Sequence, residues 1–164
     1  MQRRRRLLGL QVLASGAVDK MTDIAVTAIS MNAALEDFES LDDAYAPPFS
    51  TAIHPFLQAV YVPLNKLSGD LVSMTPAEYL NGAGRSRRII DTNPRPVIPG
   101  ATYVDLTQIN GSIEEIGKEE PLLLVCTREK QAYFLQNRLK YYGYQNTKVL
   151  EGGVTFNEVH AFGQ

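Results

Sequence analysis

Residues that build covalent frameworks and metal sites are scarce in this sequence. It contains one cysteine, two histidines and no tryptophan among 164 residues. A single cysteine excludes an internal disulfide framework and is typical of proteins in a reducing compartment. His54 and His160 have no ligand spacing with Cys126 or with each other, so we expect no metal site. We therefore expect a cytoplasmic protein in which Cys126 is a free thiol.

The sequence also lacks a strong net charge and a long apolar run. Its formal net charge is -2 and its pI is ≈ 5.7, although residues 3–6 are all arginine. This balance gives no general attraction to nucleic acid or to anionic membranes. The first 17 residues imitate a secretory signal, but Gly9 and Gln11 interrupt the apolar stretch. We expect neither a membrane nor a nucleic-acid partner.

The stretch around Cys126 predicts a strand, a tight loop and a helix. Residues 122–126 form a short apolar run typical of a buried strand, and apolar residues then recur at helical spacing over residues 131–142. Cys126 therefore ends a strand just before a helix N-terminus. The N–H groups of such a loop, together with the helix dipole, favour a thiolate and bind an anion. Arg128 and Lys130 support the thiolate, whereas Glu129 opposes it.

The residues around this stretch alternate between strand and helix patterns. We expect strands at residues 87–91, 103–106 and 147–150. Thr75 and Glu78 have capping-box spacing with a proline between them, which predicts a helix start, and Ser112 and Glu115 form a second possible box. This alternation predicts an α/β fold with a parallel sheet flanked by helices. Sites in such sheets form at the carboxyl ends of the strands.

This pattern resembles the rhodanese (sulfurtransferase) family over residues 75–157. The shared landmarks are the strand-terminal Cys126 with its six-residue loop, I-I-D at residues 89–91, I-P-G-A at 98–101 and V-L-E-G-G at 149–153. The resemblance implies that Cys126 carries a persulfide. It implies that the cradle consists of Thr127, Arg128, Glu129, Lys130, Gln131 and Ala132. Gly152 and Gly153 would let the chain turn close beside this loop.

The loop also departs from the family pattern, C-R-S-G-x-R-S. Glu129 stands at the glycine and Gln131 at the second arginine, while Asn93 and Val97 replace an arginine and a histidine in a neighbouring loop. Two hypotheses follow. Cys126 and the loop length favour a sulfurtransferase. The substitutions favour an inactive rhodanese-like domain that acts as a dimerisation or docking module, in which the cysteine is a buried structural residue.

The first part of the chain has a different pattern. Apolar spacing predicts a strand at residues 6–13, a helix at 18–31 and another helix ending near residue 69. The string A-Y-A-P-P-F-S at residues 44–50 contains two adjacent prolines, which exclude a regular helix and predict a stiff, extended segment. Tyr45 and Phe49 lie on this segment. This part resembles the C-terminal dimerisation domain of FAD-dependent pyridine nucleotide-disulfide oxidoreductases, in the NADH oxidase and coenzyme A-disulfide reductase branch. The resemblance implies that Tyr45 reaches the partner's active site, or that Tyr45 and Phe49 fill the dimer interface.

We therefore expect two parts, a partial dimerisation domain at residues 1–70 and a rhodanese-like domain at 71–164, with a linker at 67–74. No G-x-G-x-x-G follows a predicted strand, so this chain alone should bind no cofactor. FAD, NAD(P)H and coenzyme A are implied for an intact family member. We expect a C-terminal fragment of a coenzyme A-disulfide or persulfide reductase. We also expect a homodimer, with a persulfide, polysulfide, thiosulfate or coenzyme A persulfide as substrate.

Overall fold

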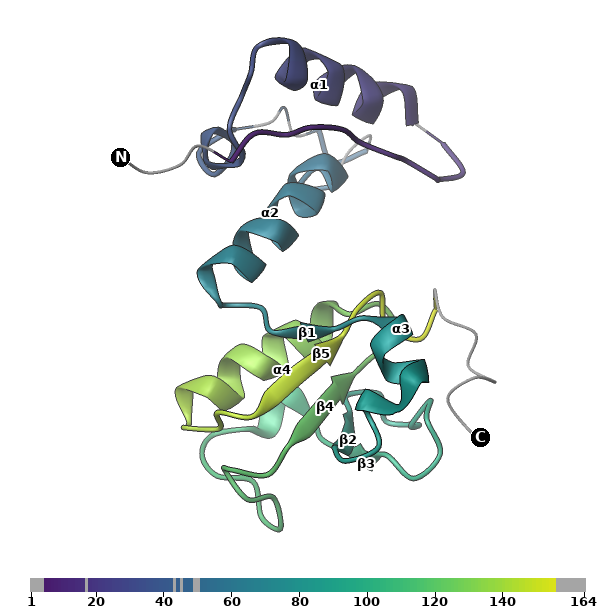
Figure 1. Cartoon of the computed structure of the whole chain (residues 1–164), viewed down its shortest axis with the longest axis vertical. Coiled ribbons are helices and arrows are strands. Elements are labelled where there is room, and N and C mark those ends of the chain that lie inside the picture. Colours follow the sequence, from purple (N-terminus) through teal and green to yellow (C-terminus); the bar gives the residue numbers. More distant parts are fainter. Residues whose placement is uncertain (1–4, 17, 43, 45, 49–50, 156–164) are drawn as a thin grey trace. The chain divides into compact units, whose positions relative to one another are not determined.

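The computed structural model describes residues 5–16, 18–42, 44, 46–48 and 51–155 (Figure 1). The chain divides into two compact units, residues 1–68 and 69–164. This division falls inside the predicted linker. None of the helices in the described residues combines the length and the apolar character needed to cross a membrane.

The N-terminal unit is built from helices. These are α1 (Val18–Ser30), the 3-10 turn η1 (Leu35–Phe38) and α2 (Pro55–Ser68). They bury a small apolar core in which the rings of Phe38 and Phe56 meet edge to face with centroids 5.4 Å apart. The two predicted helices are confirmed.

The strand predicted at residues 6–13 is wrong. Among the described residues this segment makes only an isolated antiparallel bridge between Arg6 and Ala34. Leu8 is 87% exposed and Leu13 is fully exposed. A strand needs a neighbour that accepts its backbone hydrogen bonds and covers its apolar face. The alternation of apolar residues alone therefore did not produce a strand here.

The C-terminal unit is a five-stranded parallel sheet with the order β1-β5-β4-β2-β3. Its strands are β1 (Ser73–Met74), β2 (Arg88–Asp91), β3 (Thr102–Tyr103), β4 (Leu122–Val125) and β5 (Thr147–Leu150). Its helical elements are α3 (Pro76–Glu78), the π-helical turn η2 (Tyr79–Ala83), the 3-10 turn η3 (Leu106–Gln108) and α4 (Lys130–Tyr141). The expected α/β fold is confirmed. Strand β1 was not predicted, because its two residues lie within the predicted linker.

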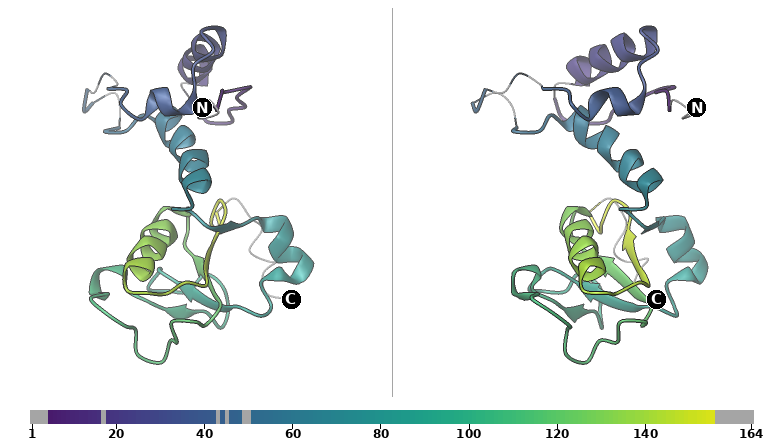
Figure 2. Two further views of the ribbon diagram at one scale, coloured as in Figure 1. Left: turned by 60° about the vertical axis from the view of Figure 1, so that its left-hand side comes forward. Right: turned by 90° about the vertical axis from the view of Figure 1, so that its left-hand side faces the viewer.

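The central strand β4 divides the core into two layers. Leu122, Leu124 and Cys126 pack on the face that α4 covers, whereas Leu123 and Val125 pack on the opposite face. This division follows from the period of two of a strand. Figure 2 shows α4 and α3 on opposite faces of the sheet. The Cys126 side chain therefore lies on the same face as the helix that follows it.

The predicted capping box at the start of α3 is confirmed. The Thr75 hydroxyl accepts the N–H of Glu78 at 3.2 Å, and the Glu78 carboxylate accepts the N–H of Thr75 at 2.7 Å. These reciprocal bonds satisfy two N–H groups that the helix leaves without intrahelical partners.

The second capping box, at Ser112 and Glu115, is wrong because long-range hydrogen bonds hold this segment out of a helix. Ile113 donates its N–H to the Tyr144 hydroxyl at 2.7 Å, and that hydroxyl donates to the Ile116 carbonyl at 3.3 Å. The residue at position 115 has a φ of 65°. Tertiary contacts thus occupy backbone groups that a helix would use.

Candidate active site

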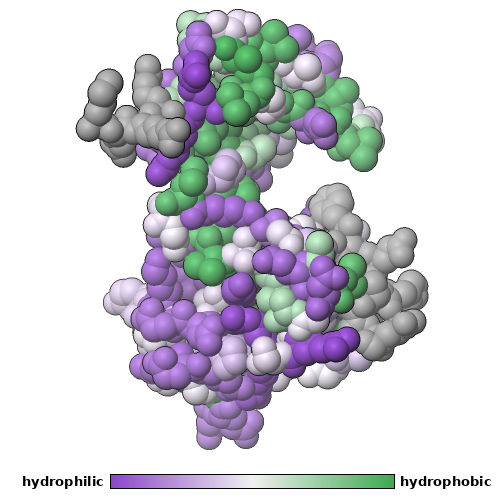
Figure 3. Space-filling view, viewed as in Figure 1, coloured by the Kyte–Doolittle hydropathy of each residue, from purple (hydrophilic) through white to green (hydrophobic). Residues whose placement is uncertain are grey.

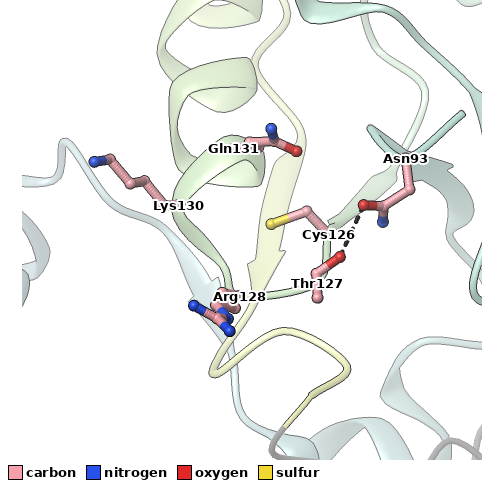
Figure 4. A pocket seen from close by; sticks show the side chains of 6 residues that line it. All are labelled: Asn93, Cys126, Thr127, Arg128, Lys130 and Gln131. Atoms are coloured by element: carbon pink, nitrogen blue, oxygen red, sulfur yellow. Dashed lines mark hydrogen bonds between the residues drawn. The ribbon is translucent and has the colours of Figure 1, made fainter.

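Cys126 lies at the carboxyl end of β4, where a pocket of about 390 Å³ opens. The pocket is lined by Asn93, Cys126, Thr127, Arg128, Lys130 and Gln131. Figure 4 shows the sulfur projecting into the space bounded by the Arg128, Lys130 and Gln131 side chains. Cys126 is only 2% exposed and belongs to the apolar core beneath α4. The sulfur therefore forms the floor of the pocket.

Most backbone N–H groups of the loop after Cys126 have no internal partner. Helix α4 begins at Lys130, so its first N–H groups lack intrahelical acceptors. Within the described part of the chain, no hydrogen bond is made by the N–H groups of Thr127, Arg128, Gln131 and Ala132. The other two are used internally: the Glu129 N–H closes a turn with the Cys126 carbonyl over residues 127–128, and the Lys130 N–H donates to the Arg128 carbonyl at 2.8 Å. The loop thus retains four N–H donors without an internal partner, which an external anion can use.

The bond from Lys130 to Arg128 closes a γ-turn centred on Glu129. Glu129 has φ 66° and ψ -39°, a conformation that is rare and strained for a residue other than glycine. Its carboxylate accepts the N–H of Gly152 at 2.7 Å. Glu129 does not line the pocket. The negative charge expected within the loop is therefore directed to the turn after β5.

The loop after β2 forms the other wall of the pocket. The buried Asp91 carboxylate accepts the N–H groups of Asn93 at 2.8 Å and Val97 at 2.7 Å, together with the Asn93 side-chain amide at 2.6 Å. Asn93 in turn accepts the Thr127 hydroxyl at 2.8 Å, as Figure 4 shows. The Thr92 hydroxyl donates to the Gln131 side chain at 3.3 Å. Uncharged hydrogen bonds thus join the two loops.

Sequence reasoning treated Asn93 only as a replacement and missed its place in the pocket wall. The available signal was its position directly after β2, the neighbour of β4. Carboxyl ends of adjacent parallel strands meet at one edge of the sheet, so polar residues there are candidates for a shared site.

The segment after β5 holds the outer side of the cysteine loop. Val154 donates its N–H to the Cys126 carbonyl at 3.1 Å, and Thr155 donates its N–H and its hydroxyl to the Thr127 carbonyl at 3.0 and 2.7 Å. Gly153 has a φ of 60°, and a Cβ there would lie 2.5 Å from the Cys126 carbonyl oxygen. The expected close turn beside the loop is confirmed.

The charged residues of the pocket are cationic. Arg128 and Lys130 line it, and no carboxylate of the described residues does. Figure 4 shows the Lys130 ammonium pointing away from the sulfur, and this group lies 5.8 Å from the centre of the Phe134 ring. Such a separation permits a cation–π contact. The Lys130 ammonium therefore stands at the rim rather than beside the sulfur.

The remaining expected site residues have separate places. Ala132 is buried in the core beneath α4 and does not line the pocket. Tyr45 and Phe49 lie outside the described residues. His54 accepts the N–H of Phe56 at 3.3 Å at the start of α2, and His160 lies outside the described residues. In the described part of the chain, no three His, Cys, Asp or Glu side chains gather as metal ligands would.

Known proteins share this architecture. A NAD-dependent persulfide reductase from A. fulgidus matches with a TM-score of 0.73 and 26% identity, over 87% of this chain and 26% of that one. The reduced CoADR-RHD of Bacillus anthracis matches with a TM-score of 0.73 and 25% identity, over 84% of this chain and 25% of that one. The chain thus spans about a quarter of the length of either structure.

Sequence comparisons give the family. No curated protein matches this sequence significantly. The family model of the rhodanese-like domain matches residues 75–155. This match includes Cys126, the loop that follows it and all the strands of the sheet except β1. Residues 75–155 of this chain are therefore a rhodanese-like domain.

Proposed function

We propose that Cys126 accepts a sulfane sulfur atom and carries it as a persulfide to an acceptor. The observation that carries this proposal is the position of the sulfur in a pocket beside a loop whose N–H groups, at four residues, have no partner in the described chain. Such donors and the N-terminus of α4 stabilise a terminal sulfur anion without a metal. The candidate donors are a persulfide, a polysulfide, thiosulfate or coenzyme A persulfide.

The proposed reaction consists of two displacements at sulfur. With thiosulfate as donor, the Cys126 thiolate attacks the outer sulfur. A sulfur–sulfur bond to Cys126 forms, the sulfur–sulfur bond of thiosulfate breaks, and sulfite leaves with the electron pair. An acceptor thiolate or cyanide then attacks the terminal sulfur of the persulfide, and Cys126 leaves as a thiolate. Both steps balance without an external oxidant or reductant.

A direct test is the release of thiocyanate from cyanide and thiosulfate, or from cyanide and a polysulfide. We expect turnover by the full chain and none above background by Cys126→Ser. Mass spectrometry should find one added sulfur atom on Cys126 after donor treatment without an acceptor. Equal background rates in both proteins with every donor would reject sulfur transfer at this residue.

The larger protein proposed for this chain is a coenzyme A-disulfide or persulfide reductase of the NAD(P)H-dependent flavoprotein family, with this chain as its C-terminal part. The rhodanese-like domain is about half of the chain, yet the match to the persulfide reductase covers 87% of it. The similarity therefore extends into the N-terminal unit. This extent supports the assignment of that unit as a partial dimerisation domain.

FAD and NAD(P)H are assigned to other parts of that larger protein. Dinucleotide phosphates bind a glycine-rich turn between a strand and a helix. The turn from β4 into α4 contains Thr127, Arg128 and Glu129, has no glycine and lies beside Cys126. This turn therefore does not fit a dinucleotide, and no step of the proposed reaction uses one.

A homodimer formed through the N-terminal unit is part of the proposal. Leu8 is 87% exposed and Met31 75% exposed in this unit, and Figure 3 shows extended apolar surface over it. A groove of about 650 Å³ runs along α1 and η1 and includes Ile24, Met31 and Leu41. Apolar surface of this kind marks interaction sites. A second copy of the chain would cover it.

A non-catalytic docking module is the second candidate. The observations that favour it are the 2% exposure of Cys126 and the use of the Lys130 N–H inside the γ-turn. Under this alternative, the sulfur packs as a small apolar group and the loop is a surface feature. Donor treatment would then leave the mass of the protein unchanged, whereas dimer formation would not depend on Cys126.

A further inference from the structure

A side chain of the cysteine loop, that of Glu129, is hydrogen-bonded to the segment after β5. Val154 and Thr155 donate to the carbonyls of Cys126 and Thr127 and hold the beginning of the loop. Beyond Thr127 the chain turns toward α4. There the half-buried Glu129 accepts the Gly152 N–H at 2.7 Å through its carboxylate. This bond holds the middle of the loop.

The same residue sets the path of the loop backbone. Glu129 adopts a positive φ that residues other than glycine rarely adopt, and the γ-turn around it uses the Lys130 N–H internally. A conformation of this kind persists only where surrounding contacts enforce it. The carboxylate bond to Gly152 is the side-chain contact that can do so here. The orientation of the peptide groups on either side of Glu129 depends on this turn.

We propose that Glu129 is a positioning residue for sulfur transfer, an inference that rests on the proposed function of Cys126. By accepting the Gly152 N–H, its carboxylate fixes the loop so that the free N–H groups of the neighbouring residues are held in place to receive the terminal sulfur of the Cys126 persulfide. Glu129 does not touch the substrate itself, because it is not among the pocket-lining residues.

The proposed role of Glu129 in fixing the loop favours sulfur transfer, whereas its negative charge opposes it. Substitutions can therefore separate the two effects. A carboxylate near an anionic persulfide raises its energy, whereas a fixed loop lowers the energy of the transition state. Glu129→Gln keeps an acceptor for the Gly152 N–H and removes the charge. Glu129→Ala removes both, and Glu129→Asp keeps the charge on a side chain one methylene shorter.

The test uses the full chain and these three variants. Glu114→Ala is the matched control, because Glu114 is an exposed carboxylate of the same unit that does not line the pocket. We measure thiocyanate formation from thiosulfate and cyanide, and hydrogen–deuterium exchange of the Gly152 amide, whose N–H the Glu129 carboxylate accepts. We expect Glu129→Ala and Glu129→Asp to lower kcat/KM by about tenfold, since small misplacements of catalytic groups have effects of this size.

Those two variants should also accelerate exchange of the Gly152 amide, because its N–H loses or weakens its bond to the carboxylate, while Glu129→Gln restores slow exchange and keeps kcat/KM within about threefold. Glu114→Ala should match the parent in both measurements. Equal rates in Glu129→Ala and the parent, or equal loss in Glu129→Gln and Glu129→Ala, would overturn the inference. If the parent transfers no sulfur, the proposed function fails, and the exchange measurement alone then decides whether Glu129 holds the loop.

Discussion

The two units of this chain differ in how many of their large apolar residues are exposed. In the C-terminal unit, all four residues of β4 are completely buried between two layers of side chains. In the N-terminal unit, Leu8, Leu13 and Met31 face solvent around a small helical core. A parallel sheet covered on both faces completes its own core. The comparison indicates that the first unit leaves a larger share of its large apolar residues exposed than the second.

The largest expected effect on stability tests the closed core of the C-terminal unit. Leu124→Ala should lower the free energy of unfolding of this unit by ~2–5 kcal/mol, because Leu124 is fully buried at the centre of the sheet. Urea denaturation followed by circular dichroism measures this change. Leu8→Ala is the matched control and should change stability by less than ~0.5 kcal/mol. Similar losses in both variants would contradict the contrast between the units.

The second prediction concerns Gly153 beside the cysteine loop. Gly153→Ala should lower the free energy of unfolding by ~1–3 kcal/mol, because the new Cβ would lie 2.5 Å from the Cys126 carbonyl oxygen at a positive φ. The loop must shift, so thiocyanate formation should fall as well. Gly100→Ala provides the control, since Gly100 also has a positive φ but has open space around it. An equal loss in the two variants would show that φ alone, rather than the contact, matters.

The third prediction concerns the segment that connects β3 and β4. Tyr144→Phe should lower the free energy of unfolding by ~1–3 kcal/mol, because it removes the hydroxyl that joins the N–H of Ile113 to the carbonyl of Ile116. Hydrogen exchange at residues 109–121 should accelerate. Tyr141→Phe is the control, because Tyr141 is 83% exposed. Unchanged exchange in Tyr144→Phe would mean that other contacts hold this segment.

The sequence predicts most of the C-terminal unit because its local signals agree with its tertiary contacts. The strand at residues 147–150 and the capping box at Thr75 were predicted correctly, since an apolar run and a cap are encoded within a few residues. The helix expected after Ser112 does not form, because hydrogen bonds from Tyr144 decide that segment. Long-range contacts of this kind have no local signature.

The site shows the same division between local and distant information. The position of Cys126 between β4 and α4 could be read from apolar spacing. The direction of the Glu129 carboxylate could not, because its partner, Gly152, is 23 residues away. The hydrogen bond of Asn93 with Thr127 also joins two loops that only the sheet order brings together. Sequence reasoning located Cys126 and the glycine turn beside its loop, and missed the side-chain hydrogen bonds of Glu129 and Asn93.

The smallest changes in stability are expected at exposed residues of the N-terminal unit, where substitutions should instead weaken association of two chains. Leu8→Ser and Met31→Ser change exposed side chains of the N-terminal unit, so each should alter the free energy of unfolding of the isolated chain by less than ~0.5 kcal/mol. If a second copy covers these residues, both variants should weaken the dimer in sedimentation equilibrium. Val72→Ser, at an exposed residue of the C-terminal unit, should leave association unchanged. A monomeric parent protein, or equal weakening by all three variants, would contradict a dimer formed through the N-terminal unit. The exposed residues of that unit would then need a different covering surface, such as the rest of a longer reductase.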